Sequence, residues 1–134
     1  MSRTDVFFDS NVLLYVLSAG SDKALRSEQL LAAGGVISVQ VLNECAHAMR
    51  RKFKAQWPLV HQMLASARNN CSVVPVTEEI HVRGIAFAER YQFQVYDGMI
   101  VAAALIAGCT TLWSEDMNDG MVIDGLTIRN PYKP

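Results

Sequence analysis

The sequence has no long hydrophobic run. Its longest apolar stretch, Met99 to Ala107, is about half the length needed to cross a bilayer. The first residues, Met1 to Asp5, lead directly into a short strand-like run and lack the apolar core of a signal peptide. We therefore expect a soluble, cytoplasmic protein that has no membrane partner.

Cysteine is scarce and scattered. The three cysteines, Cys45, Cys71 and Cys109, form no CxxC pair and no short cluster with histidine. This spacing argues against a disulfide framework and against a structural zinc site. Cys45 and Cys109 fall within apolar helical patterns, which predicts that they are small buried hydrophobic residues.

An excess of charge of either sign is also missing. The chain has 12 basic and 13 acidic residues, a formal net charge of −1. This balance does not by itself indicate a nucleic-acid or membrane-surface partner. Hydrophobic residues make up 51% of the chain and charged residues 19%, which excludes intrinsic disorder.

Linkers and internal repeats are absent, so the 134 residues are expected to form one domain, 1–134. Short apolar runs alternate with amphipathic stretches. The predicted strands are 6–8, 36–38, 71–74, 111–113 and 126–129, and the predicted helices are 12–17, 22–33, 42–53, 58–67, 78–90 and 97–107. This alternation predicts an α/β fold, in which helices cover both faces of a central parallel sheet of about five strands.

The segment Asp124-Gly125 is ambiguous, because Asp-Gly between two apolar triplets is also a hairpin signal. We favour a turn that leads into a lone parallel strand.

Carboxylates follow two of the predicted strands. Asp9 comes directly after strand 6–8, and Asp116 lies just past strand 111–113, with Asp119 in the same loop. In open parallel sheets, active sites form at the carboxyl ends of the strands. These acids are therefore candidates for a functional site.

Two further acids lie in unexpectedly apolar surroundings. Glu44 follows Leu42 near the start of a helix, and Asp97 opens the most apolar helix of the chain. A carboxylate beside core-facing positions is costly unless it is paired, hydrogen-bonded or bound to a metal.

Each acid also has a purely structural alternative. Asp9 and Asp97 suit helix N-caps, and Glu44 suits a first-turn partner of the helix dipole or a solvent-exposed position. Asp116 and Asp119, with Gly120, suit a polar turn. A bound cation would nevertheless explain all four acids together. Acids that share one sheet edge repel one another, and a cation removes this repulsion. Mg²⁺ or Mn²⁺ prefers such oxygen ligands, so we expect an all-oxygen divalent-metal site.

Four segments carry these acids: residues 7–15, 38–44, 96–98 with the following alanine-rich helix, and 112–117. Their combination and order resemble the PIN-domain ribonuclease family, in particular the VapC-like toxins of bacterial toxin–antitoxin pairs. The closing segment 125–132 also has the family's character. The likeness spans nearly the whole chain. No single motif is specific, but their combination is.

The resemblance implies a three-layer α/β/α fold and a metal site formed by Asp9, Glu44, Asp97 and Asp116, with Asn11 and the Ser114 hydroxyl nearby. It also implies an RNA substrate, a homodimer and a cognate antitoxin that covers the cleft.

The sequence departs from the family pattern at two positions. Asp119 is an extra acid, which suits a metal ligand, an outer partner of a ligand or a turn residue equally well. Gly98 replaces a residue that is frequently alanine, and it is expected to loosen the start of its helix.

The hypothesis is that the protein is an endoribonuclease that hydrolyses RNA phosphodiester bonds with Mg²⁺ or Mn²⁺. A polyanion that approaches this acidic site needs flanking positive charge, which a strip of four residues offers: Arg50, Arg51, Lys52 and Lys54. The alternative for this strip is a solvated helix end whose cations suit the dipole. The histidines, His47, His61 and His81, have no partner at metal-ligand spacing and are not required.

Three other functions compete with the nuclease. A receiver-like phosphoacceptor domain needs an acidic pair at the first strand, but Ser10 and Asn11 follow Asp9. A haloacid-dehalogenase-type phosphatase needs a second Asp where Asn11 stands. A catalytically silent RNA- or protein-binding PIN module remains open.

Overall fold

A computed structural model describes residues 4–133 of the chain. Residues 1–3 and 134 lie outside the described residues, so the expectations about the first residues and about a domain over 1–134 extend beyond them. The elements follow in the order β1 (Val6–Phe8), α1 (Ser10–Tyr15), α2 (Asp22–Ala33), β2 (Gly35–Ser38), α3 (Val39–Arg51), α4 (Trp57–Asn70), β3 (Cys71–Val74), α5 (Glu78–Tyr91), α6 (Val95–Ile106), β4 (Thr111–Trp113), β5 (Val122–Ile123) and β6 (Leu126–Arg129).

The six strands form one sheet in the order β3-β2-β1-β4-β6-β5. β1 pairs in parallel with β2 on one side and with β4 on the other, which makes it the central strand at which the chain changes direction across the sheet. The carboxyl ends of β1 and β4 are therefore neighbours, because Phe8 is in register with Trp113. The residues that follow these two strands emerge at the same edge.

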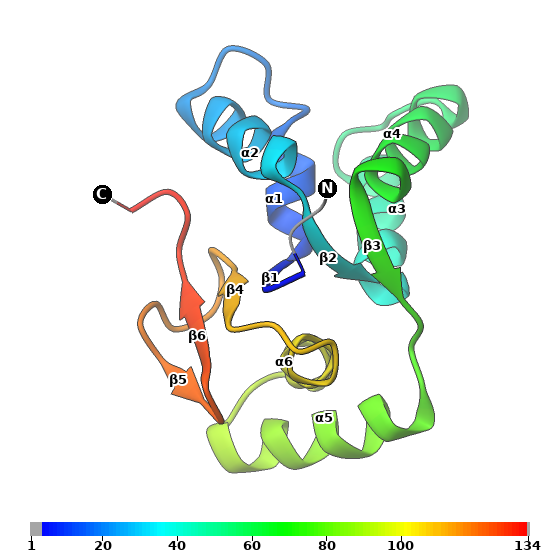
Figure 1. The fold of residues 1–134 in the computed structure, drawn as a ribbon. Helices are drawn as coiled ribbons and strands as arrows, with labels where there is room; N and C mark the ends of the chain where they lie inside the picture. The colour runs from blue at the N-terminus through cyan, green and yellow to red at the C-terminus, as the bar shows by residue number, and fades with distance from the viewer. Residues whose placement is uncertain (1–3, 134) are drawn as a thin grey trace.

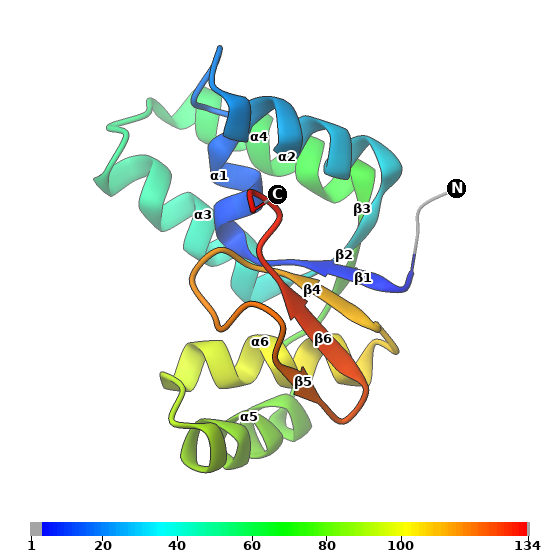
Figure 2. The same cartoon turned by 90° about the vertical axis from the view of Figure 1, so that its left-hand side faces the viewer.

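The helices cover both faces of the sheet. α1 to α4 lie on one side, and α5 and α6 lie on the other (Figures 1 and 2). This arrangement confirms the expected three-layer α/β/α fold. Among residues 4–133, no helix is both long and apolar enough to cross a bilayer.

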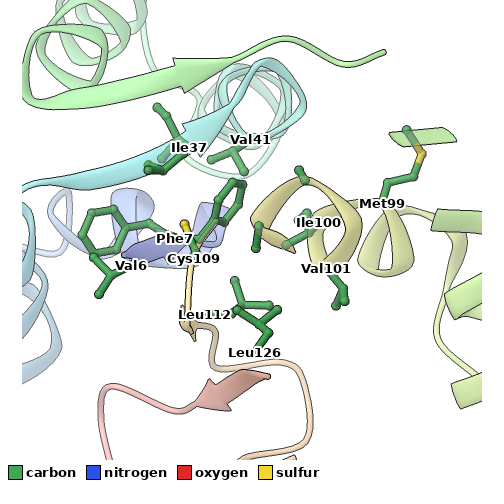
Figure 3. Packing of buried hydrophobic residues seen from close by; sticks show 14 of the residues in the cluster. Val6, Phe7, Ile37, Val41, Met99, Ile100, Val101, Cys109, Leu112 and Leu126 are labelled. Atoms are coloured by element: carbon green, nitrogen blue, oxygen red, sulfur yellow. The ribbon is translucent and has the colours of Figure 1, made fainter. Parts of the chain in front are cut away.

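The main core lies between the sheet and the helices. All three residues of β1 are buried, and Ile100 and Val101 of α6 pack in the same cluster as strand residues (Figure 3). Burial of such side chains contributes about 1.5–3 kcal/mol each. The three cysteines are buried free thiols, as expected for two of them.

The segment around Asp124 forms a hairpin, so the expectation of a lone strand after a simple turn was wrong. β5 pairs antiparallel with β6, and β6 pairs in parallel with β4. Asp124 and Gly125 adopt positive φ values of 49° and 88°. A two-residue hairpin turn of type I′ requires positive φ at both central residues, and Asp-Gly supplies it. The extra strand makes the sheet six-stranded and mixed.

Gly98 allows α5 and α6 to cross closely. The expectation that it loosens the start of its helix stays a prediction. A Cβ atom placed at Gly98 would lie 2.3 Å from the carbonyl oxygen of Gly84 in α5. A Cβ atom at Gly84 would likewise lie 2.6 Å from Cγ of Met99. Small residues at both positions therefore set the spacing of the two helices, and with it the position of Asp97.

Candidate active site

Asp9 lies buried at the carboxyl end of β1, where it is the N-cap of α1. Its Oδ1 accepts a hydrogen bond from the backbone N–H of Ser10 at 2.7 Å, and its Oδ2 accepts one from the Ser114 hydroxyl at 2.7 Å. Burial raises the pKa of Asp9 to about 6, and the charges of Asp97 and Asp116 add to the rise against these hydrogen bonds. Asp9 is thus both a cap and a member of an acidic cluster.

Asp97 lies in the first turn of α6. The helix begins at Val95, two residues earlier than expected, and its N-cap is Gln94. Asp97 is therefore not the N-cap, which removes the structural alternative for this residue. Burial and the charge of Asp116 raise its pKa.

Glu44 lies half-buried in α3, one turn after Gln40. Burial raises its pKa to about 7, and the charges of Asp9 and Asp97 contribute to the rise. One of its carboxylate oxygens, Oε1, is buried without a hydrogen-bonding partner among residues 4–133. The first-turn alternative fails, because Glu44 is the sixth residue of its helix.

Asn11 lies in the first turn of α1 and contacts Asp116. Its Nδ2 donates a hydrogen bond to Oδ2 of Asp116 at 3.1 Å. Its Oδ1 is buried and, like Oε1 of Glu44, lacks a partner within the described residues. Asp116 itself is exposed at the mouth of the site.

These residues fit a divalent cation. The donors are carboxylate and amide oxygens, which Mg²⁺ and Mn²⁺ prefer. The two unpartnered buried oxygens, one on Asn11 and one on Glu44, are the kind of atoms that a cation or its waters satisfy. Within residues 4–133, no three His, Cys, Asp or Glu side chains lie close enough to hold one ion as they stand. Burial is the main cause of the raised pKa of Asp9, Glu44 and Asp97, and the charges of neighbouring acids add to the rise.

A model of the PIN-domain family matches residues 6–118, which include all four acids. The chain belongs to the PIN-domain family. This membership gives no support to the receiver-like and haloacid-dehalogenase alternatives. A comparison with curated proteins finds no match to the chain.

Solved structures share the fold of this PIN domain. A toxin–antitoxin complex from Klebsiella pneumoniae has a chain that is 20% identical with a TM-score of 0.72, over 96% of this chain and 99% of that one. VapC20 of Mycobacterium tuberculosis, a toxin that cleaves the sarcin–ricin loop, is 16% identical with a TM-score of 0.65, over 83% and 89%. VapBC2 from Rickettsia felis, bound to promoter DNA, is 16% identical with a TM-score of 0.67, over 93% and 97%.

Asp119 stands apart from the other acids of the PIN domain. Its Oδ1 accepts a hydrogen bond from the backbone N–H of Asn130 at 2.7 Å, and its Oδ2 lies 3.9 Å from Nζ of Lys133. These contacts join the loop after β4 to the segment after β6. Of its three possible roles, they favour the turn residue.

The four residues of the basic strip differ in what they contact. Arg50 donates a hydrogen bond to the carbonyl oxygen of Ala55 at 2.9 Å, and its guanidinium lies 4.3 Å from the ring centroid of Trp57. Arg50 therefore holds the loop between α3 and α4. Arg51 and Lys52, in contrast, line a cavity of about 280 Å³ together with Asn11, Glu44 and Asp116. Lys54 lies exposed in the loop that follows, with a positive φ of 51°.

Sequence reasoning missed a set of polar residues that support the loop after β4. Tyr15 donates a hydrogen bond to Oε1 of Glu115, and Lys23 forms an ion pair with Oε2 of the same residue. Glu115 precedes Asp116, so these contacts fix the backbone beside a candidate ligand. No local signal reveals them, because the partners lie about a hundred residues apart in the sequence.

Gln40 was also missed. It is buried, its Nε2 donates to the carbonyl oxygen of Tyr96 at 2.9 Å, and it lies 3.5 Å from Oε2 of Glu44. Its place one turn before Glu44 on the same helix face is a signal that sequence reasoning could have used.

Proposed function

We propose that this PIN domain is a divalent-metal-dependent endoribonuclease, in which Asp9, Glu44, Asp97 and Asp116 hold Mg²⁺ or Mn²⁺. The observation that carries the proposal is Asp9: a buried carboxylate at the end of the central strand, whose pKa is raised to about 6 and which interacts electrostatically with Asp97 and Asp116. Perturbed acids gathered at a sheet edge are characteristic of functional sites.

The metal, when bound, supplies a water activated at neutral pH and charge neutralisation at the scissile phosphate. The chain's own residues orient the ligands. The Ser114 hydroxyl and the Ser10 N–H fix both oxygens of Asp9, and Asn11 holds Asp116 by its amide. Arg51 and Lys52 line the same cavity as Glu44 and Asp116, where they attract the RNA phosphates.

The proposal extends to the biological role of a toxin that acts in the cytoplasm. Support comes from the similarity in fold to toxin–antitoxin structures from several bacteria. A cognate antitoxin that covers the acidic site, and a homodimer, belong to this proposal through the family resemblance.

A catalytically silent PIN module that binds RNA or protein is the second candidate. It is favoured by the spacing of the acids, since no three acidic, histidine or cysteine side chains in residues 4–133 stand close enough to hold one ion.

The experiment measures cleavage of single-stranded RNA by wild type, Asp9→Asn and Asp97→Asn, with Mg²⁺, with Mn²⁺ and with a chelator. Asp124→Asn is the matched control, because Asp124 is an exposed acid in the β5–β6 turn. We expect cleavage only with metal, and only by wild type and the control. Equal cleavage by Asp97→Asn contradicts the proposed site, whereas RNA binding without cleavage by wild type supports the silent module.

A further inference from the structure

A second cavity adjoins the proposed active site. It has a volume of about 460 Å³ and lies between α3, the segment after β3 and the start of α6. Its apolar lining comes from Val39, Val76 and Met99, and Tyr96 stands at its edge with 62% of its surface exposed. A volume of this order accommodates a small organic ligand.

The two cavities share a wall. Glu44 and His47 line both the apolar cavity and the charged cavity. The charged cavity is also lined by Asn11, Asp116, Arg51 and Lys52. A ligand whose phosphate occupies the charged cavity therefore has its next group within reach of the apolar cavity.

The two cavities differ in charge and polarity, as the phosphate and the base of a nucleotide do. Arg51 and Lys52 line the charged cavity, whereas no lysine or arginine of residues 4–133 lines the apolar one. The first matches a phosphate and the second matches a nucleobase, which needs an aromatic surface and a few hydrogen-bonding groups.

We propose that the cavity beside Tyr96 binds the RNA base adjacent to the scissile phosphate, with Tyr96 as the stacking surface and Asn43 and His47 as the groups that read its edge. This inference rests on the proposed nuclease function. Asn43 and His47 are exposed and lie one turn apart on α3. Neither side chain has a hydrogen-bonding partner within residues 4–133, so both are available to a ligand.

A hydrogen bond joins two of the residues that line the cavity, Gln40 and Tyr96. The Gln40 amide donates to the backbone carbonyl oxygen of Tyr96 at 2.9 Å, so the residue that carries the aromatic ring is fixed to α3. A pre-organised site loses less conformational freedom on binding. Gln40 thus positions Tyr96 and does not itself read the base.

A second copy of the chain is the competing occupant, because exposed apolar side chains also suit a protein interface. The continuity of the cavity with the charged site and the free polar groups on α3 favour the base. The test therefore includes the oligomeric state.

The experiment measures binding of fluorescently labelled 2′-O-methyl hexanucleotides (A, C, G and U homopolymers) and of an abasic hexamer in Mg²⁺, by anisotropy. Wild type is expected to bind at least one homopolymer about tenfold more tightly than the abasic hexamer, as one base–aromatic stack provides. Tyr96→Ala should remove this difference, and Tyr96→Phe should retain it. Asn43→Ala or His47→Ala should change the ranking of the four homopolymers. Val95→Ala, an exposed neighbour outside the cavity, is the control.

Equal binding of all probes by wild type, or an unchanged preference in Tyr96→Ala, overturns the proposal. A wild-type dimer that dissociates in Tyr96→Ala, measured by sedimentation velocity, also overturns it, because the face then belongs to a second copy. The nuclease proposal is judged separately. A base preference that depends on Tyr96, without RNA cleavage, supports the base-binding cavity and contradicts the nuclease proposal. RNA cleavage without a base preference supports the nuclease proposal and contradicts the base-binding cavity.

Discussion

The Gln40 side chain donates a hydrogen bond to the backbone carbonyl oxygen of Tyr96 at 2.9 Å. This contact joins α3, which carries Glu44, to the first turn of α6, which carries Asp97. Because the same amide nitrogen lies 3.5 Å from Oε2 of Glu44, one buried side chain fixes the relative placement of two candidate metal ligands.

Gln40→Ala is therefore expected to lower RNA cleavage by about tenfold, since small displacements of reacting groups reduce rates steeply. It should also lower the free energy of unfolding by about 1 kcal/mol, the value of a typical hydrogen bond. Cleavage rates and urea unfolding measure the two effects. Gln56→Ala is the control, because Gln56 is exposed and makes no side-chain cap bond. A full cleavage rate in Gln40→Ala would contradict the positioning role.

Gly98→Ala is expected to destabilise the protein, although Gly→Ala within a helix normally stabilises it by about 1 kcal/mol. The added Cβ would lie 2.3 Å from the Gly84 carbonyl oxygen, so α5 and α6 must separate. The cost of such overpacking is about 1–3 kcal/mol. Thermal unfolding measures it, and cleavage should fall because Asp97 moves with the helix.

Gly108→Ala is the control that separates the overpacking at Gly98 from backbone strain. A Cβ at Gly108 meets no atom of residues 4–133 within 4 Å, but the residue has a positive φ of 82°. A Gly98→Ala protein that is more stable than wild type would show that the helix crossing tolerates a methyl group.

The metal-free protein is expected to lose stability as the pH rises from about 4 to about 7. The folded-state pKa is raised to about 6 for Asp9 and to about 7 for Glu44. Between the unfolded and folded values the folded state binds more protons than the unfolded state, so the free energy of unfolding falls with rising pH. On this basis the titration of Asp9 alone lowers the free energy of unfolding by about 3 kcal/mol.

The comparison of wild type with Asp9→Asn by urea unfolding isolates that contribution, because the variant lacks the titrating group. Mn²⁺ should restore stability to wild type at about pH 7.5 by binding the folded state. Parallel pH profiles for the two proteins would contradict the raised pKa of Asp9.

Arg51→Ala and Arg50→Ala are expected to affect different properties, RNA binding and stability, although the residues are adjacent. Arg51 lines the charged cavity, so its removal should weaken RNA binding. The slope of the logarithm of the binding constant against the logarithm of the salt concentration should become shallower by about 1, the value of one phosphate contact. Arg50 contacts Ala55 and Trp57, so its removal should lower the free energy of unfolding by about 1 kcal/mol. Salt-dependent RNA binding and thermal unfolding of both variants test this division. Equal losses of RNA affinity would assign both residues to the substrate.

The order of strands and helices was predictable from local pattern. Short buried runs followed by amphipathic helices predicted every parallel strand, and the N-caps Ser21 and Thr77 begin α2 and α5 next to the predicted helix starts. Asp9 was also predictable as a site residue, because its place directly after a strand depends only on the neighbouring sequence. The β5–β6 hairpin was misjudged, because β5 has only two residues and its pairing with β6 outweighs its weak local pattern.

The sequence by itself determined that four acids would be brought to one edge of a parallel sheet, since that follows from which residues end the strands and begin the helices. Only the tertiary structure decided how the polar residues divide. In the folded chain Asp119 accepts a hydrogen bond from the backbone of Asn130, Arg50 lies over the ring of Trp57, and Arg51 lines the charged cavity. The reason is physical. A hydrogen bond or a ring contact with a residue distant in the sequence depends on packing, and no local pattern encodes it.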